Sequence, residues 1–181
     1  MAEKQSYDDW LKAEFGAVID ALDLNDLQKR FLRARWVDQV VWMGGRANKA
    51  RTWYYLLRLT AIIGGVMVPA LVSLNLSGQT GVQVGWLVFV ISLLVAISTA
   101  VESFFSYGER WRHYRQTVET LKSEGWQFFQ LAGSYRRYDT YAAAYPRFAT
   151  RVEEINQQDV QVYISQVVDE KEETSRESNE G

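Results

Sequence analysis

The stretch from Leu59 to Val101 contains no charged residue. It holds two apolar runs, and each can cross about 30 Å of hydrocarbon as a helix of about 20 residues. The polar turn formers NLSGQTG at 75–81 separate the two runs. The sequence therefore predicts an antiparallel hairpin of two membrane-spanning helices, at about 53–76 and 84–107. A buried hairpin in a soluble helical protein is the alternative interpretation.

The segments on either side of this hairpin are as polar as a soluble protein. The chain is 48% hydrophobic, yet its mean hydropathy is −0.22. We therefore expect an all-α membrane protein, in which cytosolic amphipathic helices before and after the hairpin form a helical bundle. The predicted parts are an N-terminal amphipathic segment at 1–26, a two-transmembrane domain at 27–168 and a disordered acidic tail at 169–181.

Basic residues flank the two apolar runs unequally. Eight lie between Lys29 and Arg58 against one acid, Asp38, and three arginines between 110 and 115 follow the second run. The connection has no lysine or arginine. Because positive flanks stay in the cytoplasm, both termini should be cytoplasmic, with the hairpin in the inner (plasma) membrane. Aromatic residues typical of the membrane interface mark the inner ends: Trp53, Tyr54, Tyr55, Phe104, Phe105 and Tyr107.

Residue composition argues against most kinds of enzyme. The chain has no cysteine, and His113 is its only histidine, so a metal site or a nucleophilic triad lacks its ligands or its base. No glycine-rich phosphate loop, pair of catalytic carboxylates or nucleophile elbow is present. We expect no enzyme activity, cofactor or metal. The net charge of −2 gives no general attraction to nucleic acid.

Apolar residues also recur at helical spacing outside the hairpin. One face is predicted before it from Trp10, Phe15, Ile19 and Leu22, and another, in a helix capped by Asn25 and Asp26, from Leu27, Phe31, Ala34 and Val41. After the hairpin, three–four spacing predicts a coiled-coil-like seam of Trp111, Tyr114, Val118, Leu121, Gly125 and Phe128, with Gly108 and Gly125 as helix breaks. Phe148, Val152 and Ile155 then form one more apolar face.

Three segments carry a family resemblance. They are RWVDQVVW at Arg35–Trp42, IIGGVMVPAL at Ile62–Leu71 and GERWRHYR at Gly108–Arg115. Together they make the region from about Leu27 to Val168 resemble the SLATT superfamily of prokaryotic two-transmembrane proteins, effector domains associated with SMODS nucleotidyltransferases and SLOG nucleotide sensors. The resemblance implies a membrane pore in a defence or signalling system. Such effectors often accompany a sensor domain or a partner gene, so the resemblance also implies a sensor or signalling partner, and it leaves the activating signal open.

The first apolar run contains Gly64, Gly65 and Pro69. Proline cannot donate a hydrogen bond to the carbonyl of Gly65, so a kink is expected there. The glycines allow a neighbouring helix to approach closely. Tight packing within the hairpin and a moving gate are both consistent with this pattern.

The second run carries one small and polar stripe, formed by Ser92, Ala96, Thr99, Ser103 and Ser106, with Glu102 beside it. Such a stripe faces protein or water rather than lipid. It is either a seam between helices or the lining of an aqueous path. Glu102 should lie at the same depth as Arg58, so these two residues form a candidate intramembrane ion pair.

Two functions follow from these patterns. The first is a homo-oligomeric pore or channel that conducts ions, because two helices alone cannot enclose a water path. Glu102, repeated in each subunit, would then favour cations, unless Arg58 neutralises it. The second is a membrane-anchored helical module that binds a partner protein without conducting. The expected partners are the lipid bilayer, further copies of the chain, cations in the first case, and a sensor or signalling protein.

Overall fold

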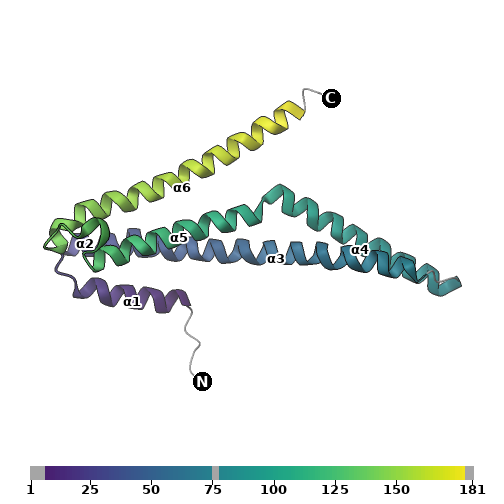
Figure 1. The fold of residues 1–181 in the computed structure, drawn as a ribbon, viewed down its shortest axis with the longest axis horizontal. Helices are drawn as coiled ribbons and strands as arrows, with labels where there is room; N and C mark the ends of the chain where they lie inside the picture. Colours follow the sequence, from purple (N-terminus) through teal and green to yellow (C-terminus); the bar gives the residue numbers. More distant parts are fainter. Residues whose placement is uncertain (1–6, 75–77, 178–181) are drawn as a thin grey trace, which may run out of the picture. The chain divides into compact units, whose positions relative to one another are not determined.

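The structure is a computed structural model that describes residues 7–74 and 78–177, with side chains to residue 160. The described residues are helical almost throughout and include no strand. The helices are α1 (Tyr7–Ala21), α2 (Asp26–Phe31), the π-helix η1 (Leu32–Val37), α3 (Asp38–Ser73), α4 (Gly78–Phe105), α5 (Tyr107–Phe129), the 3₁₀-helix η2 (Gly133–Tyr135) and α6 (Tyr141–Glu177). Figure 1 shows their order along the chain. The expected all-α class is confirmed.

The chain divides into two compact units. One, the hairpin unit, comprises residues 45–115. The other, the aromatic-core unit, comprises the described residues up to 44 and from 116 onward. Two helical runs, Asp26–Ser73 and Gly78–Phe105, are long and apolar enough to cross a membrane by length and composition.

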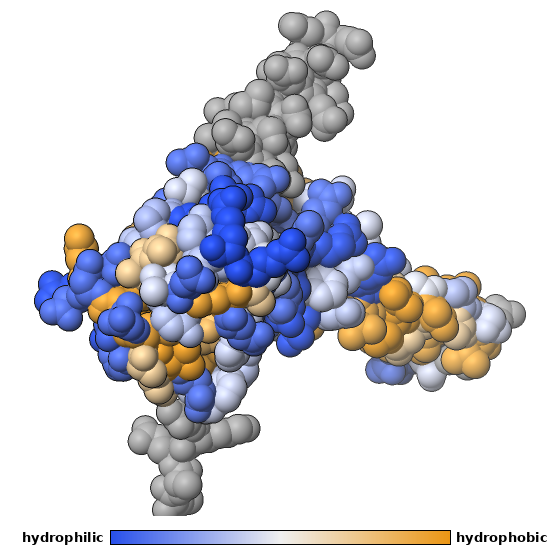
Figure 2. All heavy atoms as spheres, turned by 60° about the vertical axis from the view of Figure 1, so that its left-hand side comes forward, coloured by the Kyte–Doolittle hydropathy of each residue, from blue (hydrophilic) through white to orange (hydrophobic). Residues whose placement is uncertain are grey.

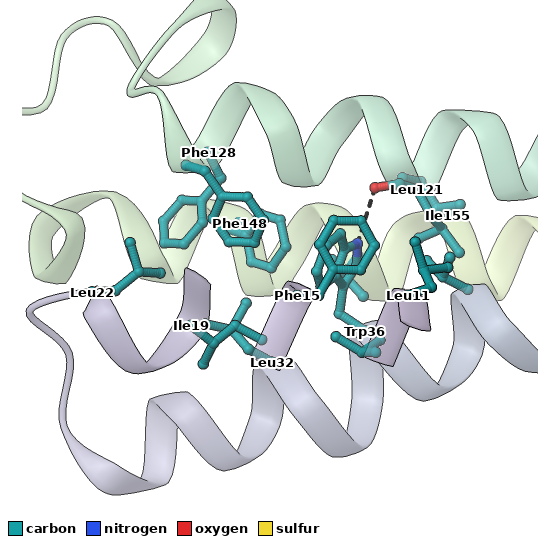
Figure 3. Close-up of a cluster of buried hydrophobic side chains, with 14 of the residues drawn as sticks. Leu11, Phe15, Ile19, Leu22, Leu32, Trp36, Leu121, Phe128, Phe148 and Ile155 are labelled. Carbon is teal, nitrogen blue, oxygen red and sulfur yellow. Dashed lines mark hydrogen bonds between the residues drawn. The ribbon is translucent and has the colours of Figure 1, made fainter. Parts of the chain in front are cut away.

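Trp36 is the centre of the aromatic-core unit, and its side chain is fully buried. Its indole Nε1 donates a hydrogen bond to the Leu121 carbonyl oxygen at 2.9 Å, as Figure 3 shows. The ring packs against Phe15 of α1, Phe129 of α5 and Phe148 of α6, with centroid distances of 4.8, 5.4 and 6.0 Å. A single side chain therefore contacts residues of three other helices.

Gly125 does not break α5, contrary to the sequence prediction. The helix continues through it to Phe129, and a Cβ at this position would overlap the Trp36 ring. The later part of the predicted seam is confirmed, since Val118, Leu121, Gly125 and Phe128 are all buried, whereas Trp111 and Tyr114 are only partly buried. Gly125 is therefore the gap in that seam into which the indole fits.

The π-helix changes which residues of the 26–43 region are buried. Leu32, Trp36, Val40 and Met43 are buried, whereas Leu27, predicted to lie on the buried face, is 76% exposed. Ala34, also predicted on that face, lies inside the π-helix and is exposed. A π turn holds more residues than an α turn, so a face read at 3.6 residues per turn is wrong across it. The predicted cap at Asn25 is confirmed. The Asn25 side chain accepts a hydrogen bond from the Gln28 backbone N–H, and the Gln28 side chain accepts one from the Asn25 backbone N–H.

Polar contacts join the other helices of this unit. Arg35 forms a two-bond ion pair with Glu153 of α6, at 2.7 and 2.8 Å. These bonds lower the pKa of the Glu153 carboxyl and raise that of the Arg35 guanidinium. Glu124 is buried and accepts a hydrogen bond from the Tyr135 hydroxyl at 2.5 Å. Burial, and then this carboxylate, raise the pKa of Tyr135.

The last helix reaches further than expected. The predicted face of Phe148, Val152 and Ile155 is confirmed as buried. However, α6 continues to Glu177 and so covers residues 169–177, for which composition predicted disorder. Glutamate and lysine are good helix formers, and they dominate this segment. The rest of the predicted tail, 178–181, lies outside the described residues.

A methyl group at Gly125 should destabilise the protein, because it would overlap the Trp36 ring. We expect Gly125→Ala to lower the free energy of unfolding by about 1 to 3 kcal/mol, the usual cost of overpacking a core. Gly16→Ala in α1 is the matched control, because no atom lies within 4 Å of its added Cβ. Thermal unfolding in detergent, followed by tryptophan fluorescence, measures both. Equal stability of the two variants would contradict the packing of Trp36 on Gly125.

Candidate functional site

The hairpin unit is built on one continuous seam between α3 and α4. The less exposed positions of each helix recur at three–four spacing, the repeat of a coiled coil. They are Tyr54, Leu57, Ala61, Gly64, Val68 and Leu71 on α3, and Gly81, Val84, Val88, Ile91, Val95, Ser98 and Glu102 on α4. Figure 1 shows the two helices running side by side. At its middle, α3 contributes the small residues Ala61 and Gly64, and α4 contributes the β-branched residues Ile91 and Val95.

Gly64 is the point of closest approach in the seam. A Cβ on it would overlap Val95 Cγ2 and lie 3.3 Å from Ile91 Cγ2. Its neighbour Gly65 faces open space, with no atom within 4 Å. The two adjacent glycines therefore differ completely in their surroundings, and only Gly64 serves helix packing. Pro69 does not end α3, which continues to Ser73.

The small and polar stripe lies beside the seam and not in it. Ser92, Ala96, Thr99 and Ser103 are all exposed, whereas Ser98 is buried. The Thr99 hydroxyl donates to the Val95 carbonyl at 2.9 Å. The stripe is therefore not a contact between the two helices of one hairpin, and these four residues form a face that the single chain leaves uncovered.

Ser106, the last member of the predicted stripe, ends α4 instead of continuing it. Its φ is +47°, in the left-handed region that few residues other than glycine adopt. The predicted break at Gly108 is thus displaced to Ser106. Gly108 itself is helical, and a Cβ on it would lie 2.8 Å from the Tyr54 ring. It is a close-approach position, like Gly64.

The candidate ion-pair residues have different surroundings. The Arg58 guanidinium donates to the Tyr54 hydroxyl at 2.8 Å and lies 5.5 Å from the centre of that ring. Glu102 occupies a partly buried position of the seam. Within the part of the chain that the structure describes, no ion pair joins Arg58 to Glu102. The structure gives Arg58 a tyrosine partner instead.

Aromatic side chains gather where the apolar helices meet the basic flanks. Trp53 stacks on Tyr107, with centroids 6.3 Å apart. Trp111 of α5 packs against Tyr54 at 6.2 Å and against Tyr55 at 5.9 Å. These contacts tie the start of the α3 apolar run to the beginning of α5.

The outer surface of the hairpin is apolar and exposed. Only 11% of the most apolar window of the first run is buried, and 6% of that of the second. The core helix of a soluble protein would be mostly buried, so the low values argue against the soluble alternative. Figure 2 shows hydrophobic side chains crowded over this hairpin, while hydrophilic ones dominate the rest of the visible surface.

Among the described residues, no three His, Asp or Glu side chains lie close enough together to bind a metal ion. His113 packs beside Tyr114, with ring centroids 5.9 Å apart. The hairpin instead presents an apolar pair of helices with one exposed face of hydroxyl side chains.

Residues 38–143 match a protein family described as a protein of unknown function, DUF4231. The chain belongs to the DUF4231 family. The matched region begins at the first residue of α3 and ends early in α6, so it contains the whole hairpin unit. No curated protein and no solved structure matches the chain. What DUF4231 shares with this chain is thus mainly the hairpin and the helices that flank it.

The adjacent glycines give a matched test of the seam. We expect Gly64→Ala to weaken the pairing of α3 with α4, because the new methyl group overlaps Val95. Gly65→Ala should keep or slightly raise stability, since it adds about 1 kcal/mol of helix propensity in open space. Thermal unfolding of the two detergent-solubilised variants should differ in sign. A larger loss from Gly65→Ala would show that the seam is wrongly placed.

Proposed function

We propose that this chain inserts the α3–α4 hairpin into the inner membrane, with both termini in the cytoplasm, and assembles into a homo-oligomer that conducts ions. Its length, hydropathy and exposed apolar surface support insertion. The distribution of lysine and arginine supports the orientation, because residues 59–101 contain neither.

The main support for assembly is the exposed hydroxyl face of α4, formed by Ser92, Ala96, Thr99 and Ser103. Ser92, Thr99 and Ser103 point neither into the α3 seam nor into any other part of the described hairpin unit. A polar face is unfavourable against lipid, so contact with further copies, or with water enclosed by them, is its best environment. Because two helices cannot surround a water path, conduction requires several copies of the hairpin.

The resemblance to the SLATT superfamily points in the same direction. Membership of that superfamily would make the protein an effector in a prokaryotic defence or signalling system, opened by a sensor or signalling partner. The proposal of a pore rests on the hydroxyl face, and the proposal of a defence role rests on the resemblance.

A membrane-anchored interaction module is the second candidate. It is favoured by a groove of about 270 Å³ in the aromatic-core unit, between α1 and α5. Tyr7, Trp10 and Trp126 line it together with Lys122 and Glu14. Exposed tryptophans and tyrosines are typical of surfaces that bind other proteins. In this case the hairpin would hold the groove near the membrane and no ions would pass.

Single cysteines test the orientation, since the chain has none of its own. Thr80→Cys, at the start of α4, should react with an impermeant thiol reagent added to intact cells. Ser134→Cys, in η2, should react only after the membrane is permeabilised. The opposite pattern of labelling would overturn the orientation, and labelling of both in intact cells would overturn insertion.

Conduction is tested with purified protein in liposomes under a salt gradient. We expect a cation-selective reversal potential for the wild-type protein. Glu102 is a seam position, but it is only partly buried and adjoins Thr99 and Ser103 of the hydroxyl face, so its carboxylate, repeated in each copy, would attract cations to a path along that face. Glu102→Gln should move that potential toward zero. Glu109→Gln, which removes an equal charge from the exposed start of α5, is the control and should leave the potential unchanged. Absence of flux in the wild-type protein would reject the pore and favour the interaction module.

A further inference from the structure

The hairpin unit is strongly basic although the whole chain is not. Residues 45–115 contain seven lysine or arginine side chains and two glutamates, a net formal charge of +5, while the chain carries −2. None of these charges lies between Leu59 and Val101. The positive charge is therefore concentrated at the one end of the hairpin where its two helices meet the flanking segments.

Two of these arginines share one face of α3. Arg51 and Arg58 are seven residues apart, or two helical turns and about 10.5 Å along the axis. Both side chains are exposed, and Tyr55 lies between them on the same face. Within the described residues, neither guanidinium forms an ion pair. Two cations on one face thus lack a counter-ion among the side chains that the structure describes.

An aromatic wall holds the deeper arginine in place. Tyr54 accepts a hydrogen bond from Arg58 at 2.8 Å, and its ring packs on Trp111. Tyr55 packs on the other side of this group, 5.9 Å from Trp111. Gly108 leaves the space that Tyr54 occupies. The Arg58 side chain is therefore pre-positioned by contacts that do not neutralise its charge.

We propose that Arg51 and Arg58, backed by Tyr54, Tyr55 and Trp111, bind the phosphate of one anionic phospholipid in the cytoplasmic leaflet. The inference rests on the proposed insertion of the hairpin. Guanidinium groups match phosphate oxygens in two-bond geometry, and tyrosine and tryptophan favour the headgroup level of a bilayer. Arg58 adjoins the apolar run and would reach the phosphate from the side of the hydrocarbon, while Arg51 would reach it from the aqueous side.

Spin-labelled lipids test this site in vesicles that contain the full-length protein. The wild-type protein should bind labelled phosphatidylglycerol more tightly than labelled phosphatidylcholine. The double variant Arg51→Gln with Arg58→Gln should lower that preference about fivefold for each arginine removed, the scale of one basic residue at an anionic surface. Arg110→Gln with Arg112→Gln removes the same charge from the same unit and should lower it much less.

Equal losses in the two double variants would overturn the site, because the preference would then reflect diffuse charge. Loss of the preference on adding inorganic phosphate would also overturn it, since the site would then take a soluble anion. Alkaline carbonate extraction of the same vesicles separates this inference from the proposed function. Extraction of the protein would reject both membrane insertion and the lipid site. Protein that stays in the vesicles but shows no lipid preference would reject only the lipid site.

Discussion

The contact of Trp36 with Gly125 is the interaction on which the aromatic-core unit depends. The indole needs the space of a missing side chain on α5, and its N–H needs the Leu121 carbonyl one turn earlier. Both are supplied by the same helix face. Phe15, Phe129 and Phe148 can then pack around a fixed ring. The π-helix η1 holds Trp36 itself, so the irregular turn and the core belong to one arrangement.

Three glycines in this chain mark close contacts rather than breaks. Gly125 receives Trp36, Gly108 receives Tyr54, and Gly64 receives Val95. The sequence predicted helix breaks at the first two, because propensity alone makes glycine a weak helix residue. The real break falls at Ser106, which no propensity would have chosen. Whether a glycine packs or bends depends on what faces it across the structure, and that partner lies far away in the sequence.

Periodicity predicted the faces that lie on regular helices. Val118, Leu121 and Phe128 on α5, and Phe148 and Val152 on α6, are buried as their spacing required. It was wrong for Leu27 in α2 and for Ala34, which lies in the π turn that shifts the phase. At the candidate site, Ser92, Thr99 and Ser103, which the sequence grouped on one stripe, are all exposed. The sequence left open what that stripe faces, because the α4 seam runs through positions directly beside it.

The asymmetry of the α3–α4 seam also limits how the hairpin can move. Val95 packs on α3 at Gly64, where a Cβ would overlap it. A slide by one turn along the seam would place Val95 against Ala61 or Val68, and both carry the Cβ that Gly64 lacks. Sliding of α4 along α3 is therefore opposed by a steric clash at Val95. If these hairpins assemble as proposed, an opening that tilts or rotates whole hairpins against one another avoids that clash.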